Sequence, residues 1–77
     1  MTQLGQKAID CLKLAELHGR WDWEWDEHYM AICERYSEKA VTVKMVELAN
    51  RGYIEYGVSA RTGWLTEKGK AALEAVK

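Results

Sequence analysis

Apolar residues in the first part of the chain recur every three or four positions, which is the spacing of one face of an α-helix. In residues 2–18 this face consists of Leu4, Ala8, Cys11, Leu12 and Ala15. The polar residues between them, which are expected to face water, are Lys7, Asp10, Lys13 and Glu16. Thr2 can cap the beginning of this helix, and Gly19 follows its last residue, where a left-handed cap residue commonly lies.

Residues 21–27 alternate Trp with Asp or Glu, a period of two that is typical of a strand with one apolar face. The helical spacing of apolar residues resumes over residues 25–36. We therefore predict a short extended segment that ends near Trp23, followed by a helix over about 25–36. Asp22 or Asp26 is the expected N-cap of that helix.

Ser37 is the expected N-cap of a third helix, and Gly52 is its expected C′ residue. The apolar face of this helix consists of Val41, Met45, Leu48 and Ala49. After Gly52 the period changes to two, because Ile54, Tyr56 and Val58 alternate with other residues, which predicts a half-buried strand.

The remainder of the chain predicts a β-hairpin and a last helix. Residues 59–63 form the loop of the hairpin, and residues 64–65 form its short return strand. Thr66 is the expected N-cap of a helix over about 67–76, in which Gly69 allows close packing against the hairpin. The apolar side of this helix consists of Ala72, Leu73 and Val76.

Two stretches of the sequence resemble MarR- and PadR-type bacterial regulators. Residues 41–54 (VTVKMVELANRGYI) resemble their recognition helix and first wing strand, and residues 64–73 (WLTEKGKAAL) resemble their wing exit, Leu-Thr-x-x-Gly. The resemblance covers about residues 26–77. It implies an α+β, mainly α fold, namely a winged helix-turn-helix with a three-helix core, a β-hairpin wing and a C-terminal helix. A single domain over residues 1–77 is expected.

The resemblance implies a small sequence-specific protein that binds double-stranded DNA and regulates transcription. The recognition helix, about residues 38–51, would lie in the major groove, and the wing, residues 57–63, on the backbone or in the minor groove. The residues expected to contact DNA are Lys39, Thr42, Val43, Lys44, Ser59, Arg61 and Thr62. Because one copy carries few basic residues, we expect either a homodimer on two half-sites or binding beside a protein partner. The small size is typical of a phage, prophage or plasmid regulator.

The Trp-rich acidic segment 21–27 leaves a second hypothesis open. Trp is enriched at the energetic centres of protein interfaces, so the chain could instead be a winged-helix protein-interaction module, an adaptor or inhibitor, that binds its partner through Trp21, Trp23 and Trp25. Alternatively, the three indoles fill the core of a chain that has no Phe, with one indole left exposed. An apolar rather than basic surface on the third helix and the wing would favour the protein-interaction hypothesis.

The charge of the chain is unevenly distributed. Its 77 residues carry 11 Lys and Arg against 12 Asp and Glu, a net charge of −1 that argues against a uniformly basic surface. Residues 1–38 hold four basic and eight acidic residues (−4), whereas residues 39–77 hold seven basic and four acidic residues (+3). The basic half therefore contains the expected recognition helix, wing and last helix.

The sequence contains no pattern that indicates catalysis or a cofactor. It has no nucleophile elbow, no phosphate-binding Gly loop and no paired carboxylates, so we expect no enzyme and no small-molecule substrate. Cys11 and Cys33 are expected to be reduced, buried thiols, and with His18 and His28 they lack the spacing of metal ligands. No apolar run is long enough to span a membrane and no leader is evident, so we expect a cytoplasmic protein.

Overall fold

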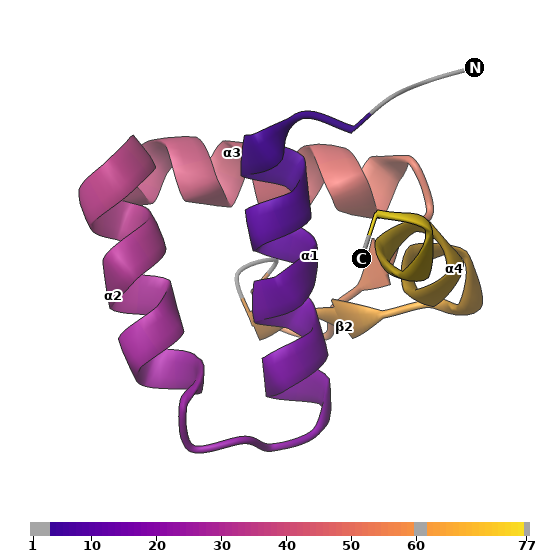
Figure 1. The fold of residues 1–77 in the computed structure, drawn as a ribbon, viewed down its shortest axis with the longest axis horizontal. Coiled ribbons are helices and arrows are strands. Elements are labelled where there is room, and N and C mark those ends of the chain that lie inside the picture. The colour runs from indigo at the N-terminus through magenta and orange to yellow at the C-terminus, as the bar shows by residue number, and fades with distance from the viewer. Residues whose placement is uncertain (1–3, 60–61, 77) are drawn as a thin grey trace.

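The computed structural model describes residues 4–59 and 62–76, which form four helices and one two-stranded antiparallel sheet. The elements are α1 (Gln6–Gly19), α2 (Trp25–Tyr36), α3 (Glu38–Asn50), β1 (Ile54–Glu55), β2 (Trp64–Leu65) and α4 (Glu67–Ala75). In Figure 1, α1 runs down the centre with α2 to its left, α3 crosses behind its upper end and α4 lies to the right. A mainly helical α+β fold with a hairpin is therefore confirmed.

Helix α1 is the centre of the hydrophobic core. It packs against α2, α3, α4 and β2, and both flanks of the helix are buried as a result. The buried apolar residues are Ala8, Cys11, Leu12, Leu14, Ala15, Ile32, Val41, Met45, Leu48, Ile54, Leu65 and Leu73. Leu14 was not among the predicted core residues, because the helical period of one face does not include it; it is buried since α1 has neighbours on several sides.

The turn between α2 and α3 is a single residue. Ser37 has φ +89° and ψ 151°, a backbone conformation that L-residues rarely adopt. Its Oγ accepts a hydrogen bond from the backbone N–H of Ala40 at 3.2 Å, so the predicted N-cap is confirmed. Because no further residue separates the two helices, they meet at a steep angle (Figure 1).

Glycine and threonine hold α3, the hairpin and α4 together. Gly52 has φ +84°, and Tyr53 N–H donates to the carbonyl of Leu48 at 2.9 Å, which confirms the predicted glycine cap of α3. Thr66 Oγ1 accepts from the N–H of Gly69 at 3.1 Å and donates to the carbonyl of Gly52 at 2.6 Å. One threonine therefore caps α4 and ties it to the end of α3.

The end of α1 differs from the prediction. Gly19 is the last helical residue rather than a left-handed cap, and Trp21 takes the left-handed conformation, with φ +55°. Gly19 has another use, because a Cβ at this position would lie 3.3 Å from the Cβ of Trp64, so glycine lets β2 approach α1. The beginning of α1 is at Gln6, and the predicted cap Thr2 lies outside the described residues.

The predicted extended segment that ends near Trp23 is wrong. Residues 20–24 form a turn, in which Asp22 Oδ1 accepts from the N–H of Glu24 at 3.0 Å. The N-cap of α2 is Glu24, without a side-chain bond, so neither predicted aspartate holds that position. The alternating pattern misleads because no strand lies beside this segment among the described residues.

The hairpin is shorter than predicted. Ile54 pairs with Leu65 and Glu55 with Trp64, and both strands end there. Only Ile54 of the predicted apolar strand face is buried: Tyr56 is 44% exposed and Val58 is 98% exposed. The alternation of apolar residues therefore continues past Glu55, where the paired strand ends. In the last helix, Val76 of the predicted apolar side is also exposed.

Burial of the Cys11 thiol makes the stability of the fold depend on pH. Cys11 is fully buried and Cys33 half-buried, and both are free, as predicted, apart from the partial exposure of Cys33. Burial, followed by the charge of Asp10, raises the pKa of the Cys11 thiol from 9.0 to about 11. A raised thiol pKa stabilises the fold below pH 9, and this stability is lost as the pH rises towards 11.

We expect this loss to be measurable by urea unfolding at a series of pH values. By about pH 10.5, the wild-type protein should lose about 2 kcal/mol more of its free energy of unfolding than Cys11→Ala loses. All other side chains are the same in the two proteins, so the difference between the two curves isolates Cys11. Parallel curves between pH 8 and 10.5 would contradict the expectation.

Candidate nucleic-acid interface

The outer face of α3 is more apolar than basic. The residues on it are Lys39, Val43, Val46, Glu47 and Asn50. Val43 is 56% exposed and Val46 38%, whereas Thr42 and Lys44 are half-buried. Thr42 Oγ1 donates to the carbonyl of Glu38 at 3.0 Å, so its hydroxyl proton is used within the helix. Of the four α3 residues predicted to contact DNA, Lys39 and Val43 are the ones that project into solvent.

Glu47 holds two basic side chains of this region. Its Oε1 lies 3.2 Å from Nζ of Lys44 and 4.0 Å from Nη1 of Arg51. Among the described residues, Lys39 makes no ion pair. The positive charge that α3 offers to an anion is therefore centred on Lys39, near the first turn of the helix.

A lysine from α1 joins this region. Lys7, Lys39 and Lys44 line a shallow groove of about 380 Å³ beside the N-terminal half of α3, which we call the lysine groove. The other lining residues are Ser37, Ala40, Val43 and Glu47. The first turn of a helix carries a partial positive charge, so this groove suits an anion such as a phosphate. Lys7 was missed because it lies in the acidic half of the sequence, 30 residues before the recognition helix.

The loop of the hairpin offers few charges in its described part. Ser59 and Thr62 are half-buried, and Thr62 Oγ1 donates to the carbonyl of Ser59 at 2.9 Å, which closes the loop. Val58 projects into solvent. Arg61, the predicted phosphate contact, lies outside the described residues.

The tryptophan segment differs from the prediction that its indoles fill the core. Trp21 is 86% exposed and Trp23 is 77% exposed, so the expectation that these indoles fill the core is wrong. Trp25 is half-buried against the core and stacks on Tyr29 at 5.2 Å, with the two rings 7° from parallel. Two indoles rather than one remain in solvent, because the leucines of α1 already occupy the space between the helices.

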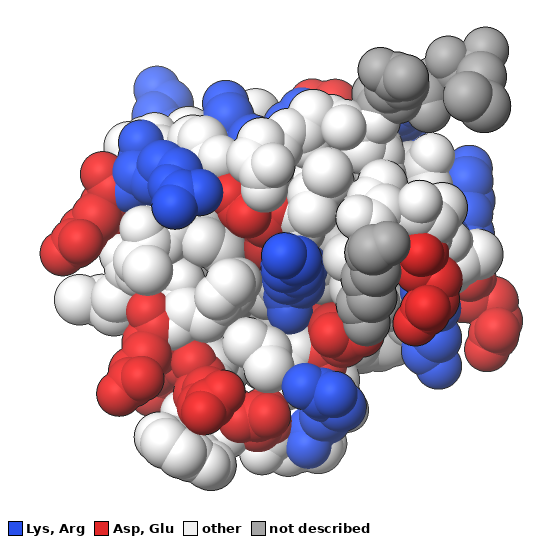
Figure 2. Space-filling view, in the orientation of Figure 1, with Lys and Arg blue, Asp and Glu red and all other residues white. Residues whose placement is uncertain are grey.

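Acidic residues gather at one corner of the face drawn in Figure 2. In Figure 2, acidic residues gather at the lower left, over the region in which α2 begins in Figure 1. Several basic residues lie along the upper edge, over α3. On the face drawn in Figure 2, this acidic cluster therefore lies away from the basic residues over α3.

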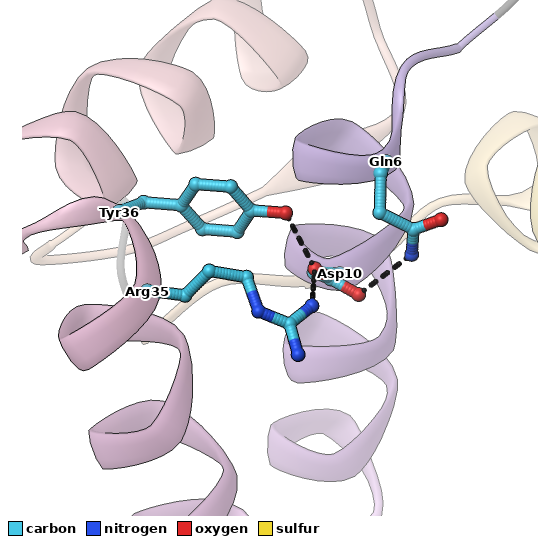
Figure 3. A network of polar contacts seen from close by, with 4 residues as sticks. All are labelled: Gln6, Asp10, Arg35 and Tyr36. Carbon is cyan, nitrogen blue, oxygen red and sulfur yellow. Dashed lines mark hydrogen bonds and ion pairs between the residues drawn. The ribbon is translucent and has the colours of Figure 1, made fainter.

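One acidic residue, Asp10, was predicted to face water but is buried. Its Oδ2 accepts from Tyr36 Oη at 2.9 Å and pairs with Arg35 Nη1 at 3.1 Å, and its Oδ1 accepts from Gln6 Nε2 at 3.0 Å (Figure 3). The prediction failed because Arg35 and Tyr36 come from the last turn of α2, which the pattern of α1 alone does not contain. The cluster links α1 to α2 directly before the turn into α3.

Two further findings come from the described parts of the chain. No group of three or more His, Cys, Asp or Glu side chains there could hold a metal ion. No helix there combines the length and the apolar character that crossing a membrane requires.

Comparisons of the chain with protein-family models, with curated proteins and with solved structures found no match.

Proposed function

We propose that the protein binds double-stranded DNA as a winged helix-turn-helix, with α3 as the recognition helix and the hairpin as the wing. The observation that carries this proposal is the lysine groove, in which Lys7, Lys39 and Lys44 converge beside the first turns of α3. The order of three helices, hairpin and helix, with a single residue between α2 and α3, supports it. Among the residues that the structure describes, those of the lysine groove supply most of the attraction to phosphate.

The arrangement divides the contacts between backbone and bases. Lys7 and Lys39 pair with phosphates, which positions α3 without reading sequence. Val43 projects from the middle of the outer face, where it can contact a thymine methyl, and Glu47 can accept from a cytosine amino group. Since so few side chains reach the bases, we propose a transcriptional regulator that acts as a homodimer on two half-sites.

The proposal is tested by fluorescence anisotropy with a labelled mixed-sequence duplex at several salt concentrations. Lys7→Ala/Lys39→Ala removes two phosphate contacts, so the slope of log K against log salt should become shallower by about 2 and affinity should fall at least about tenfold. Lys13→Ala/Lys70→Ala removes two exposed lysines outside the lysine groove and serves as the matched control. An equal loss in both double variants would refute this interface, and no binding by the wild type would refute the function.

A second candidate is a protein-interaction module that uses the Trp-rich segment 21–27. The exposure of Trp21 and Trp23 favours it, because monomeric proteins rarely leave two neighbouring indoles in water. The apolar outer face of α3 and the exposed Val58 also fit this candidate. The turn that carries Trp21 and Trp23 lies at the opposite end of the molecule from α3 (Figure 1), so a partner bound at this turn alone is compatible with DNA on α3.

A further inference from the structure

The turn between α1 and α2 surrounds a small pocket with aromatic rings and carboxylates. The pocket has a volume of about 170 Å³ and is lined by His18, Trp21, Asp22, Trp23, Trp25 and Asp26. We infer that this pocket, which we call the indole pocket, binds arginine side chains of a basic segment in a partner protein. The inference rests on the second candidate function and names the chemistry of the partner.

The backbone holds Trp21 in an unusual position. Trp21 N–H donates to the carbonyl of His18 and Asp22 N–H to the carbonyl of Leu17, both at 3.0 Å, which is the bonding pattern of a glycine-capped helix end. At the position where glycine is preferred, this chain has an exposed indole with φ +55°. Glycine would stabilise the turn more, so the indole is better explained by an external contact than by folding.

The rings around the pocket are held in place by one another. The ring of His18 lies 5.4 Å from that of Trp21 and 5.6 Å from that of Trp25, centroid to centroid. Trp25 in turn stacks on Tyr29. His18 Nδ1 and Trp25 Nε1 are buried without a hydrogen-bond partner among the described residues. The rings of His18, Trp21 and Trp25 are therefore held in a fixed arrangement beside the pocket.

Charge identifies the ligand as a cation. Asp22, Glu24, Asp26 and Glu27 lie within six consecutive positions, and Arg20, which is 3.6 Å from Asp22, pairs with one of them. Indole faces attract cations, and a guanidinium group can stack on an indole while it donates to a carboxylate. Arginine therefore matches both the rings and the acids of this turn, whereas lysine matches the charge alone.

Other occupants fit less well. Indoles could stack on nucleic acid bases, but four carboxylates would repel the phosphates. A second copy would have to present its basic end, and such a head-to-tail contact continues into a ring or an open chain rather than ending at a two-fold dimer. A purely apolar segment would leave the carboxylates desolvated without partners. A basic segment of another protein satisfies the rings and the charges together.

The experiment is an anisotropy titration of the full chain with labelled octapeptides that alternate Arg or Lys with Gly, and with a Leu-rich peptide. We expect the Arg peptide to bind more tightly than the Lys peptide. Trp21→Gly/Trp23→Ser should weaken the Arg peptide about tenfold, because it removes two cation–indole contacts. Glycine suits the backbone at position 21, so this variant keeps the fold.

Two further variants separate the contributions of charge and of general exposure. Asp26→Asn/Glu27→Gln should weaken the Arg peptide several-fold and leave the turn intact, since Asp22 still bonds Glu24. Val58→Ser removes an exposed apolar side chain of the hairpin and should have no effect.

The outcomes distinguish the inference from the candidate function on which it rests. Equal binding of the Arg and Lys peptides, unchanged by loss of the indoles, would overturn the inference in favour of simple charge attraction. Indole-dependent binding of the Leu-rich peptide alone would overturn the choice of arginine and leave the docking surface standing. Binding of no peptide would overturn both. Affinity for duplex DNA should be the same for the wild type and Trp21→Gly/Trp23→Ser.

Discussion

Replacing Gly69 by alanine is expected to lower the free energy of unfolding by about 3 kcal/mol, the upper end of the usual cost of overpacking. A Cβ at this position would overlap the carbonyl oxygen of Tyr53 and lie 3.1 Å from Cδ2 of Leu65. The obstacle is backbone rather than a flexible side chain, and Tyr53 is held there by a hydrogen bond from the N–H of Thr66 at 3.1 Å. Relief of the overlap would therefore separate α4 from the hairpin.

The sign of this effect is diagnostic, because alanine normally stabilises a helix relative to glycine by about 1 kcal/mol. The matched control is Gly57→Ala in the hairpin loop, where no atom lies within 4 Å of the added methyl group. That variant should be neutral or stabilised by up to about 1 kcal/mol. Urea unfolding followed by circular dichroism measures both. If Gly69→Ala were as stable as the wild type, the close approach of α4 to Tyr53 would be wrong.

Replacing Asp10 by alanine is expected to lower the free energy of unfolding by about 2–3 kcal/mol. The buried carboxylate accepts hydrogen bonds from Gln6, Arg35 and Tyr36, and its removal leaves the Tyr36 hydroxyl without its acceptor. The exposed guanidinium of Arg35 can return to water, so the loss is smaller than for a fully enclosed ion pair. Ser37, the turn into α3, follows Tyr36 directly. We therefore expect the loss of Asp10 to weaken the packing of α3 as well.

Two milder variants apportion this effect. Asp10→Asn keeps the shape and part of the accepting capacity, and Tyr36→Phe removes one hydroxyl; each should cost about 1 kcal/mol. Lys13→Ala, on the exposed surface of the same helix, should stay within about 0.5 kcal/mol of the wild type. If Asp10→Ala and Lys13→Ala had equal free energies of unfolding, the Asp10 carboxylate would not stabilise the fold.

The helix ends that could be predicted are those whose hydrogen bonds are local. Ser37, Gly52 and Thr66 act within a few residues of themselves, so their types at those positions indicate where α3 and α4 begin or end. The end of α1 violates this rule, because a tryptophan occupies the left-handed position and the nearby glycine serves a contact with Trp64 instead. That contact involves a residue 45 positions later in the chain, which local pattern does not report.

The residues of the candidate site likewise fall into those that the helical period predicts and those that only the packing of segments places. Helical period alone places Lys39 and Val43 on the outer face of α3, opposite Val41 and Met45. It does not reveal that Glu47 holds Lys44, that Lys7 reaches the same groove, or that Trp21 and Trp23 remain in water. Each of these depends on how segments pack and not on the period of one segment.

The sequence by itself therefore determined the helical class, the helix boundaries from 25 onwards, the hairpin and the separation of charge between the two halves, because periodicity, caps and net charge are properties of neighbouring residues. Only the tertiary structure decided the burial of Asp10, the convergence of the lysines and the exposure of the indoles. The physical reason is that burial depends on which distant residues fill the space around a side chain. Here α1 lies at the centre of the fold, and the buried side chains of α1 and its neighbours fill the core. No space is left there for Trp21 and Trp23, which lie in the turn.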